Sequence, residues 1–101
     1  MTFSYLHYEP SSKTIATLAA LLNHIDPDVG FDDWMRVLMV IFYETSGSED
    51  GFELADTWSS EGCKYKGTKD VRRMWRCFKP DHPKPVRIGT LIRMAKQTCT
   101  N

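Results

Sequence analysis

Apolar residues recur at helical spacing in five stretches of the chain, separated by short stretches rich in glycine, proline and serine. Small polar residues that can cap a helix precede most of these stretches. The pattern therefore predicts five short helices, with a very short extended segment at 86–88 before the last of them. The expected helix starts are Ser11 or Ser12, Asp32, Ser48, Thr68 and Gly89–Thr90.

The stretch that follows Asp32 is apolar on most of its sides, which is typical of a helix at the centre of a domain. The length of 101 residues and the ordinary apolar content predict a single domain. We expect an all-α fold, a compact bundle, with a flexible lead-in at 1–12, one helical domain at 13–97 and a frayed tail at 98–101. The expected core residues are Trp34, Leu38, Ile41, Phe42, Trp58, Trp75, Phe78 and Leu91.

The segment 69–78 carries two stripes at helical spacing. The apolar stripe comprises Val71, Met74, Trp75 and Phe78. The basic stripe comprises Lys69, Arg72, Arg73 and Arg76, and it is displaced by two residues, or about 200° of helical rotation. A helix that buries one face and presents four cations without interleaved acids on the other is suited to bind phosphates. The alternative is an ordinary solvated helix face.

A second basic motif precedes this helix, where Lys64 and Lys66 flank Tyr65 in a loop. The tyrosine ring could stack on a base while the lysines hold the nucleic-acid backbone. Alternatively, the ring packs into the core and the lysines remain in solvent. Beyond the helix, Lys79 adds one more cation to the expected nucleic-acid-binding set.

A third candidate lies at the start of the last helix, where Gly89–Thr90 allows a close approach of the backbone. Free N–H groups at a helix start can hold a phosphate, and Arg87 and Arg93 lie close enough in sequence to assist. The alternative is a tight turn into a capped helix. This candidate is a weaker phosphate site than the two basic motifs.

The formal net charge is zero, but the charges are unevenly distributed. Residues 1–62 hold two basic and eleven acidic side chains, a net charge of −9, whereas residues 63–101 hold eleven basic and two acidic side chains, a net charge of +9. This asymmetry predicts nucleic acid or another acidic partner for the basic half. Alternatively, the two halves neutralise each other across the fold.

The sequence contains none of the common catalytic or metal-binding signatures, such as a Gly-rich phosphate loop, GxSxG, HExxH or an EF-hand. We therefore expect no enzymatic activity, no cofactor and no metal. Two sets of residues could in principle bind a metal ion, but each has a simpler explanation than a metal site. A turn followed by helix-capping acids explains Asp26, Asp28, Asp32 and Asp33. No common zinc motif has the spacing of Cys63, Cys77, His82 and Cys99.

The cysteine count is odd, and no CxxC pair occurs. No secretory signal opens the chain, and its longest apolar run is too short to span a bilayer. These features favour a reduced, cytoplasmic setting without a membrane partner.

Five segments occur in an order and spacing typical of one family. They are 32–39, 51–59, 64–66, 74–78 and 88–95. Residues 18–96 thereby resemble the second type of primase C-terminal domain, which occurs in replication proteins of phages, plasmids and other mobile elements. The residues that carry the resemblance are Trp34, Trp58–Ser59, Lys64–Tyr65, Trp75, Phe78 and Ile88–Leu91.

The resemblance implies an all-helical accessory domain rather than the polymerising active site. Domains of this type accompany a primase module within a longer polypeptide, often with a helicase module downstream. The implied partners are single-stranded or template DNA, the primase catalytic domain and a helicase, in the cytoplasm of a bacterial or phage-infected cell.

The sequence therefore favours a non-catalytic replication module that contacts DNA through its basic half, by neutralising backbone phosphates. The alternative is a protein-interaction module that couples primase to helicase. Both interactions are electrostatic, so salt dependence does not separate them, whereas binding of isolated oligonucleotides does.

Overall fold

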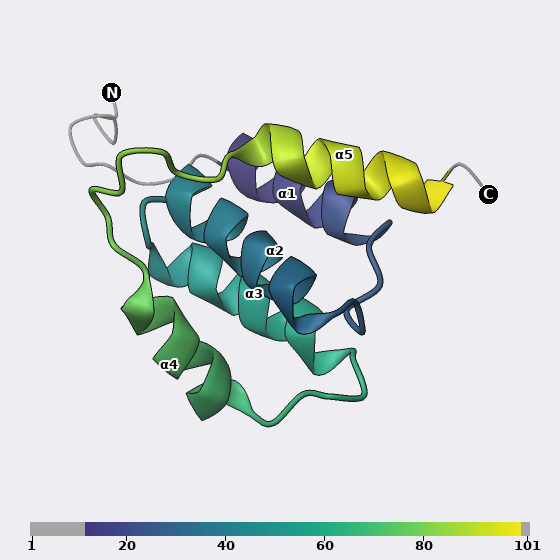
Figure 1. Cartoon of the computed structure of the whole chain (residues 1–101), viewed down its shortest axis with the longest axis horizontal. Coiled ribbons are helices and arrows are strands. Elements are labelled where there is room, and N and C mark those ends of the chain that lie inside the picture. Colours follow the sequence, from purple (N-terminus) through teal and green to yellow (C-terminus); the bar gives the residue numbers. More distant parts are fainter. Residues whose placement is uncertain (1–11, 100–101) are drawn as a thin grey trace.

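The computed structural model describes residues 12–99, which fold into five helices (Figure 1). The predicted all-α bundle is confirmed, since no strand occurs between residues 12 and 99. The lead-in expected at 1–12 and the tail expected at 98–101 lie largely outside the described residues. The helices are α1 (Ser12–Leu22), α2 (Phe31–Glu44), α3 (Glu49–Ser60), α4 (Thr68–Cys77) and α5 (Ile88–Cys99).

The starts of α2 and α3 differ in how they are capped. Ser48 is the N-cap of α3, as predicted, and its Oγ accepts a hydrogen bond from the N–H of Gly51 at 3.1 Å. The prediction that Asp32 caps α2 is wrong, because the N-cap is Gly30. Asp32 and Asp33 instead lie in the first turn, where their negative charges interact favourably with the positive end of the helix dipole.

The starts of α4 and α5 also differ from the predictions. Gly67 is the N-cap of α4, with a φ of 113° that favours glycine. Thr68 is the first helical residue, and its hydroxyl donates a hydrogen bond to Asp56 at 2.9 Å instead of capping the helix. The extended segment expected at 86–88 is absent, because Ile88 already belongs to α5.

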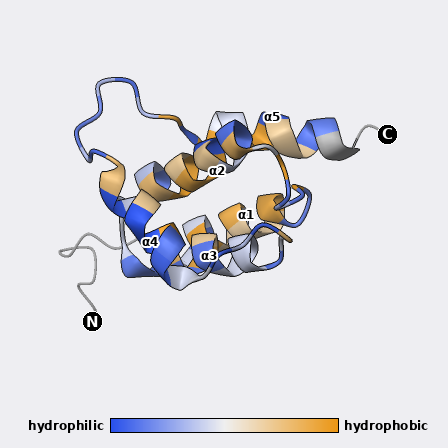
Figure 2. Ribbon diagram, turned by 60° about the horizontal axis from the view of Figure 1, so that its bottom comes forward, coloured by the Kyte–Doolittle hydropathy of each residue, from blue (hydrophilic) through white to orange (hydrophobic). Residues whose placement is uncertain are grey.

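The helix α2 occupies the centre of the bundle and contacts α3, α4 and α5. The helix α1 packs against α3 and α5. In Figure 1, α1 and α5 lie on one side of the α2–α3 pair, and α4 lies on the other side. Figure 2 shows hydrophobic residues gathered on α1 and α2 where they face the interior, whereas the loop between α4 and α5 is mostly hydrophilic.

Seven of the eight residues expected in the core are buried, namely Leu38, Ile41, Phe42, Trp58, Trp75, Phe78 and Leu91. Trp34 is only half-buried, because its ring packs against the core and also lines a surface hollow. The aromatic part of the core centres on Trp75, whose ring centroid lies 5.2 Å from that of Phe42 and 5.7 Å from that of Phe52. Through these contacts the apolar stripe docks α4 onto α2 and α3, and the basic stripe, apart from Arg72, faces outward.

Candidate nucleic-acid interface

The basic stripe of α4 is not uniform, because Arg72 is bound to the neighbouring helix. Its guanidinium donates two hydrogen bonds to the carboxylate of Glu49 in α3, at 2.8 and 2.7 Å, and lies 3.6 Å from the ring centroid of Phe52. The hydrogen bonds with Glu49 raise the pKa of Arg72 and lower the pKa of Glu49. Arg72 therefore holds α4 against α3, and a phosphate would have to compete with Glu49 for it.

The expectation that no acid interrupts the stripe is also wrong. Arg73 forms an ion pair with Asp70, three residues earlier on the same helix. The other two stripe residues, Lys69 and Arg76, are exposed. Neither of them forms an ion pair with any residue of the described chain.

The start of α5 contains a carboxylate where a phosphate was expected. Glu44, the last residue of α2, accepts a hydrogen bond from the N–H of Ile88 at 2.8 Å. It also accepts hydrogen bonds from Nε and Nη2 of Arg87, at 3.1 and 3.3 Å. The N–H of Thr90 donates to the carbonyl of Arg87 at 3.0 Å. The Glu44 carboxylate therefore occupies part of the helix start at which the sequence suggested a phosphate site.

Around this helix start lies a hollow of about 550 Å³. It contains Gly89 and Thr90 together with three arginines, Arg36, Arg87 and Arg93. Arg36 is paired with Asp33, and Arg87 with Glu44, so only Arg93 is left without an ion pair in the part of the chain that is described. Most of the positive charge of this hollow is thus neutralised.

Substitution of Glu44 tests the link between α2 and α5. We expect Glu44→Gln to destabilise the domain by about 1–2 kcal/mol at neutral pH, because hydrogen bonds to a charged group are lost. The hydrogen bonds from Arg87 lower the pKa of Glu44, burial opposes this, and the Ile88 N–H lowers it further. A lowered pKa means that the stabilisation exists above the ordinary glutamate pKa of about 4.3 and is lost below it.

Urea denaturation of the natural chain and of Glu44→Gln at neutral and acidic pH measures this effect. The difference in unfolding free energy between the two should shrink as the pH falls below about 4. Glu53→Gln is the matched control, since Glu53 is exposed. A difference that is equally large at both pH values would contradict the role of the ionised carboxylate.

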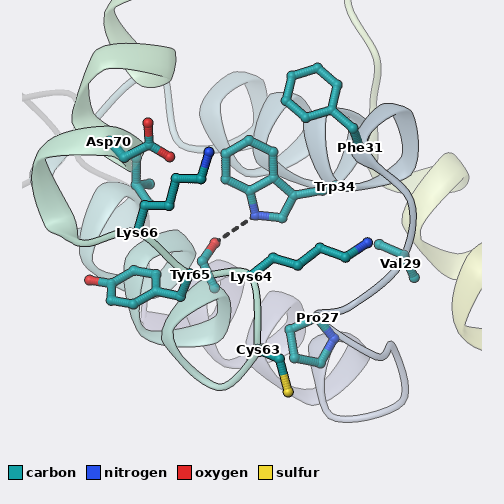
Figure 3. A pocket seen from close by; sticks show the side chains of 11 residues that line it. Pro27, Val29, Phe31, Trp34, Cys63, Lys64, Tyr65, Lys66 and Asp70 are labelled. Carbon is teal, nitrogen blue, oxygen red and sulfur yellow. Dashed lines mark hydrogen bonds between the residues drawn. The ribbon is translucent and has the colours of Figure 1, made fainter.

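A second hollow, of about 570 Å³, lies between the start of α2, the end of α3 and the loop that leads into α4 (Figure 3). Trp34 and Phe31 form one wall, and Tyr65 lies on the opposite side. Lys64 and Lys66 extend along the two sides of this hollow. The fold therefore brings the Lys64–Lys66 loop motif together with two aromatic residues that are distant in the chain.

Polar contacts hold the two walls of this hollow in place. The indole Nε1 of Trp34 donates a hydrogen bond to Oγ of Ser59 at 2.9 Å, which Figure 3 marks. The N–H of Cys63 donates to Oδ1 of Asp28 at 2.7 Å, so the loop after α3 is tied to the turn before α2.

The Tyr65 hydroxyl is held separately, since it donates to Oδ1 of Asp56 at 2.9 Å and lies 3.1 Å from the Thr68 hydroxyl. The ring is half-buried and packs against the core. The ring is thus packed as in the alternative interpretation and also lines the hollow, and stacking on a base stays a prediction.

Phe31 was not identified as a functional residue from the sequence. Its side chain is 60% exposed, although it is a large aromatic group, and its ring centroid lies 5.8 Å from that of Trp34. The spacing i, i+3 could have indicated that the two rings share one face of α2. Phe31 is the first residue of α2, directly after Gly30. Nothing in the local sequence indicates that it lines a hollow together with the loop before α4.

The charge asymmetry of the sequence is only partly neutralised by the fold. Two ion pairs join the acidic and basic halves, Arg72 with Glu49 and Arg87 with Glu44. Six of the nine cations expected to bind nucleic acid form no ion pair within residues 12–99. They are Lys64, Lys66, Lys69, Arg76, Lys79 and Arg93.

Within residues 12–99, no group of three or more His, Cys, Asp or Glu side chains is arranged to hold a metal ion. None of the described helices has the length and apolar character needed to cross a membrane.

Comparison with known families gives a direct assignment. Residues 18–95 match the family model described as Primase C terminal 2 (PriCT-2). The chain belongs to this family. The resemblance identified from the sequence is thereby confirmed, and PriCT-2 membership implies a primase-associated accessory domain. No curated protein and no solved structure matches this PriCT-2 domain.

Proposed function

We propose that this PriCT-2 domain is a non-catalytic module of a primase or primase-helicase protein and that it contacts single-stranded or template DNA. The observation that carries the proposal is the group of three exposed lysines where the loop meets α4, namely Lys64 and Lys66 in the loop and Lys69 in the first turn of the helix. None of them forms an ion pair with another described residue. The nearby acid, Asp70, is already paired with Arg73.

The positive end of the α4 dipole lies beside this loop and adds to its attraction for anions. Lysine side chains neutralise backbone phosphates without reading bases, so we expect weak and sequence-tolerant binding. Arg76, Lys79 and Arg93 are further candidates for phosphate contact. Arg72, Arg73 and Arg87 contribute less in this proposal, because their charges are engaged by carboxylates.

Fluorescence anisotropy with a labelled single-stranded oligonucleotide tests this proposal. We expect Lys64→Ala/Lys66→Ala to weaken binding about tenfold at low salt and to reduce the salt slope by about 1.4, since each phosphate contact on a single strand contributes about 0.7. Both side chains are exposed, so the double variant should remain folded.

The matched control is Lys13→Ala/Lys96→Ala, which removes the same charge from exposed positions on α1 and α5. We expect this control to lose much less affinity. An equal loss in the two double variants would mean that only net charge matters, and no loss in the first would contradict a contact at this loop.

The alternative function is coupling of primase to helicase through protein contacts. It is favoured by exposed acids on and just after α3, Asp50, Glu53 and Glu61, which form no ion pair among the described residues and could meet a basic partner. Failure of isolated oligonucleotides to bind at low salt would favour this alternative.

A further inference from the structure

We propose that the hollow between α2, α3 and the loop before α4 takes the base of one unpaired nucleotide. The base lies against Trp34 and Phe31, and the flanking phosphates lie near Lys64 and Lys66. This inference rests on the proposed DNA contact and specifies it, because it assigns the part of the DNA that enters the hollow. It also makes the domain selective for single strands.

The size and lining of the hollow suit a flat, mainly apolar ligand. Its volume of about 570 Å³ lies within the range of about 300–1,000 Å³ found for small-molecule sites. The Phe31 and Trp34 rings are neighbours, 5.8 Å apart at their centroids and inclined by 38°, so both offer apolar surface to the hollow. Phe31 is 60% exposed, and a stacked base would cover it.

Hydrogen bonds hold the Trp34 ring and the opposite side of the hollow in place without a ligand. Trp34 is held by Ser59, and the Tyr65 side by Asp56, through the hydrogen bonds described above. The loop between them is tied to Asp28 through the Cys63 N–H. A preformed wall loses little conformational freedom on binding, which favours a stable complex even with few contacts.

Lys64 and Lys66 favour a nucleotide over a neutral ligand, and the carboxylate in the lining, that of Asp70, is paired with Arg73. Lys64 and Lys66 are exposed and without ion pairs in the described chain, so two cations remain available for the phosphates on either side of a base. The indole N–H of Trp34 already has an acceptor in Ser59. With this donor occupied, stacking contributes more than hydrogen bonding to base edges, and the site should accept different bases.

Duplex DNA does not offer a base in this way, because its bases are stacked and paired. A base must leave the stack before it can lie against an aromatic side chain. The hollow therefore predicts a preference for single strands that phosphate contacts alone would not give.

The test compares two strands with equal charge, octathymidylate and an abasic octamer of the same length, each titrated into the 101-residue chain. Stacking of one base predicts that octathymidylate binds at least about fivefold more tightly than the abasic strand. Phe31→Ala should reduce this preference, because only Trp34 then remains in the wall, and it should leave the affinity for the abasic strand unchanged. Phe31→Tyr, which keeps a ring, should retain the preference.

The outcomes separate the two proposals. Equal affinity of the natural chain for both octamers would overturn the base-binding hollow but leave the phosphate contacts intact. Absence of binding by both strands at low salt would overturn the DNA contact itself. A preference that is undiminished in Phe31→Ala would mean that the base does not contact this wall and would also overturn this inference. Phe31 is largely exposed, so its replacement should not unfold the chain.

Discussion

Replacing Trp75 with alanine is expected to destabilise the domain by about 3–5 kcal/mol, the range found for deletion of large buried aromatic side chains. Trp75 is 4% exposed, and its ring meets Phe42 of α2 and Phe52 of α3 at centroid distances of 5.2 and 5.7 Å. The ring centroid of Trp75 also lies 6.3 Å from that of Phe78, the residue after α4. Loss of the ring would leave a cavity where three helices meet.

Thermal and urea denaturation measure this effect, and the melting temperature should fall by more than about 12 °C, since 1 kcal/mol corresponds to about 4–8 °C in a domain of this size. Met74→Ala is the matched control, because Met74 precedes Trp75 on the same helix and is only half-buried. A smaller loss for Trp75→Ala than for Met74→Ala would contradict the central position of the tryptophan.

Replacing Gly51 with alanine is expected to cost about 2–4 kcal/mol, through overpacking and loss of a buried hydrogen bond. A Cβ atom at this position would lie 2.1 Å from Oγ1 and 2.9 Å from Cβ of Thr45. Thr45 is fully buried, and its hydroxyl donates a hydrogen bond to the carbonyl of Ile41 at 2.7 Å. The threonine therefore cannot turn away without losing this bond, and α3 must shift relative to α2.

Gly89→Ala is the control for this substitution, since Gly89 is also helical but has no atom within 4 Å of the added Cβ. Alanine in place of glycine at an unobstructed helix position is neutral to stabilising, by at most about 0.5–1 kcal/mol in a helix interior. In urea denaturation Gly51→Ala should thus lose stability clearly, whereas Gly89→Ala should not. A neutral or stabilising Gly51→Ala would mean that α2 and α3 are less closely packed at Thr45 than the structure indicates.

Regular periodicity made the helices predictable. The apolar stripe of α4 recurs at i, i+3, i+4 and i+7, and this local property does not depend on the rest of the fold. The caps were less predictable, because Gly30 and Gly67 replace the side-chain caps expected at Asp32 and Thr68. In the case of Thr68, a distant acid competes for the hydroxyl, and no local pattern could reveal this partner.

The state of individual cations could not be predicted from local sequence either. Arg72 pairs with Glu49, which lies 23 residues earlier, and Arg87 with Glu44, which lies 43 residues earlier. These contacts depend on how the helices pack. The sequence could identify the basic stripe, but it could not indicate which of its charges are occupied.

The hollow illustrates the same limit for a binding site. Lys64, Tyr65 and Lys66 are adjacent in sequence and were recognised together. Phe31 and Trp34 come from a helix some thirty residues earlier and reach the loop only through tertiary structure. The sequence predicts Trp34 as a core residue because tryptophans are mostly buried, whereas one side of its ring lines the surface hollow.

The measurement that tests the DNA contact most directly is an NMR titration of the isotope-labelled chain with a single-stranded octamer at low and moderate salt. The proposal predicts amide shifts concentrated in residues 27–34 and 59–71, which fade as the salt concentration rises. No shifts at low salt, or shifts confined to α1 and the end of α5, would contradict a DNA contact at this loop.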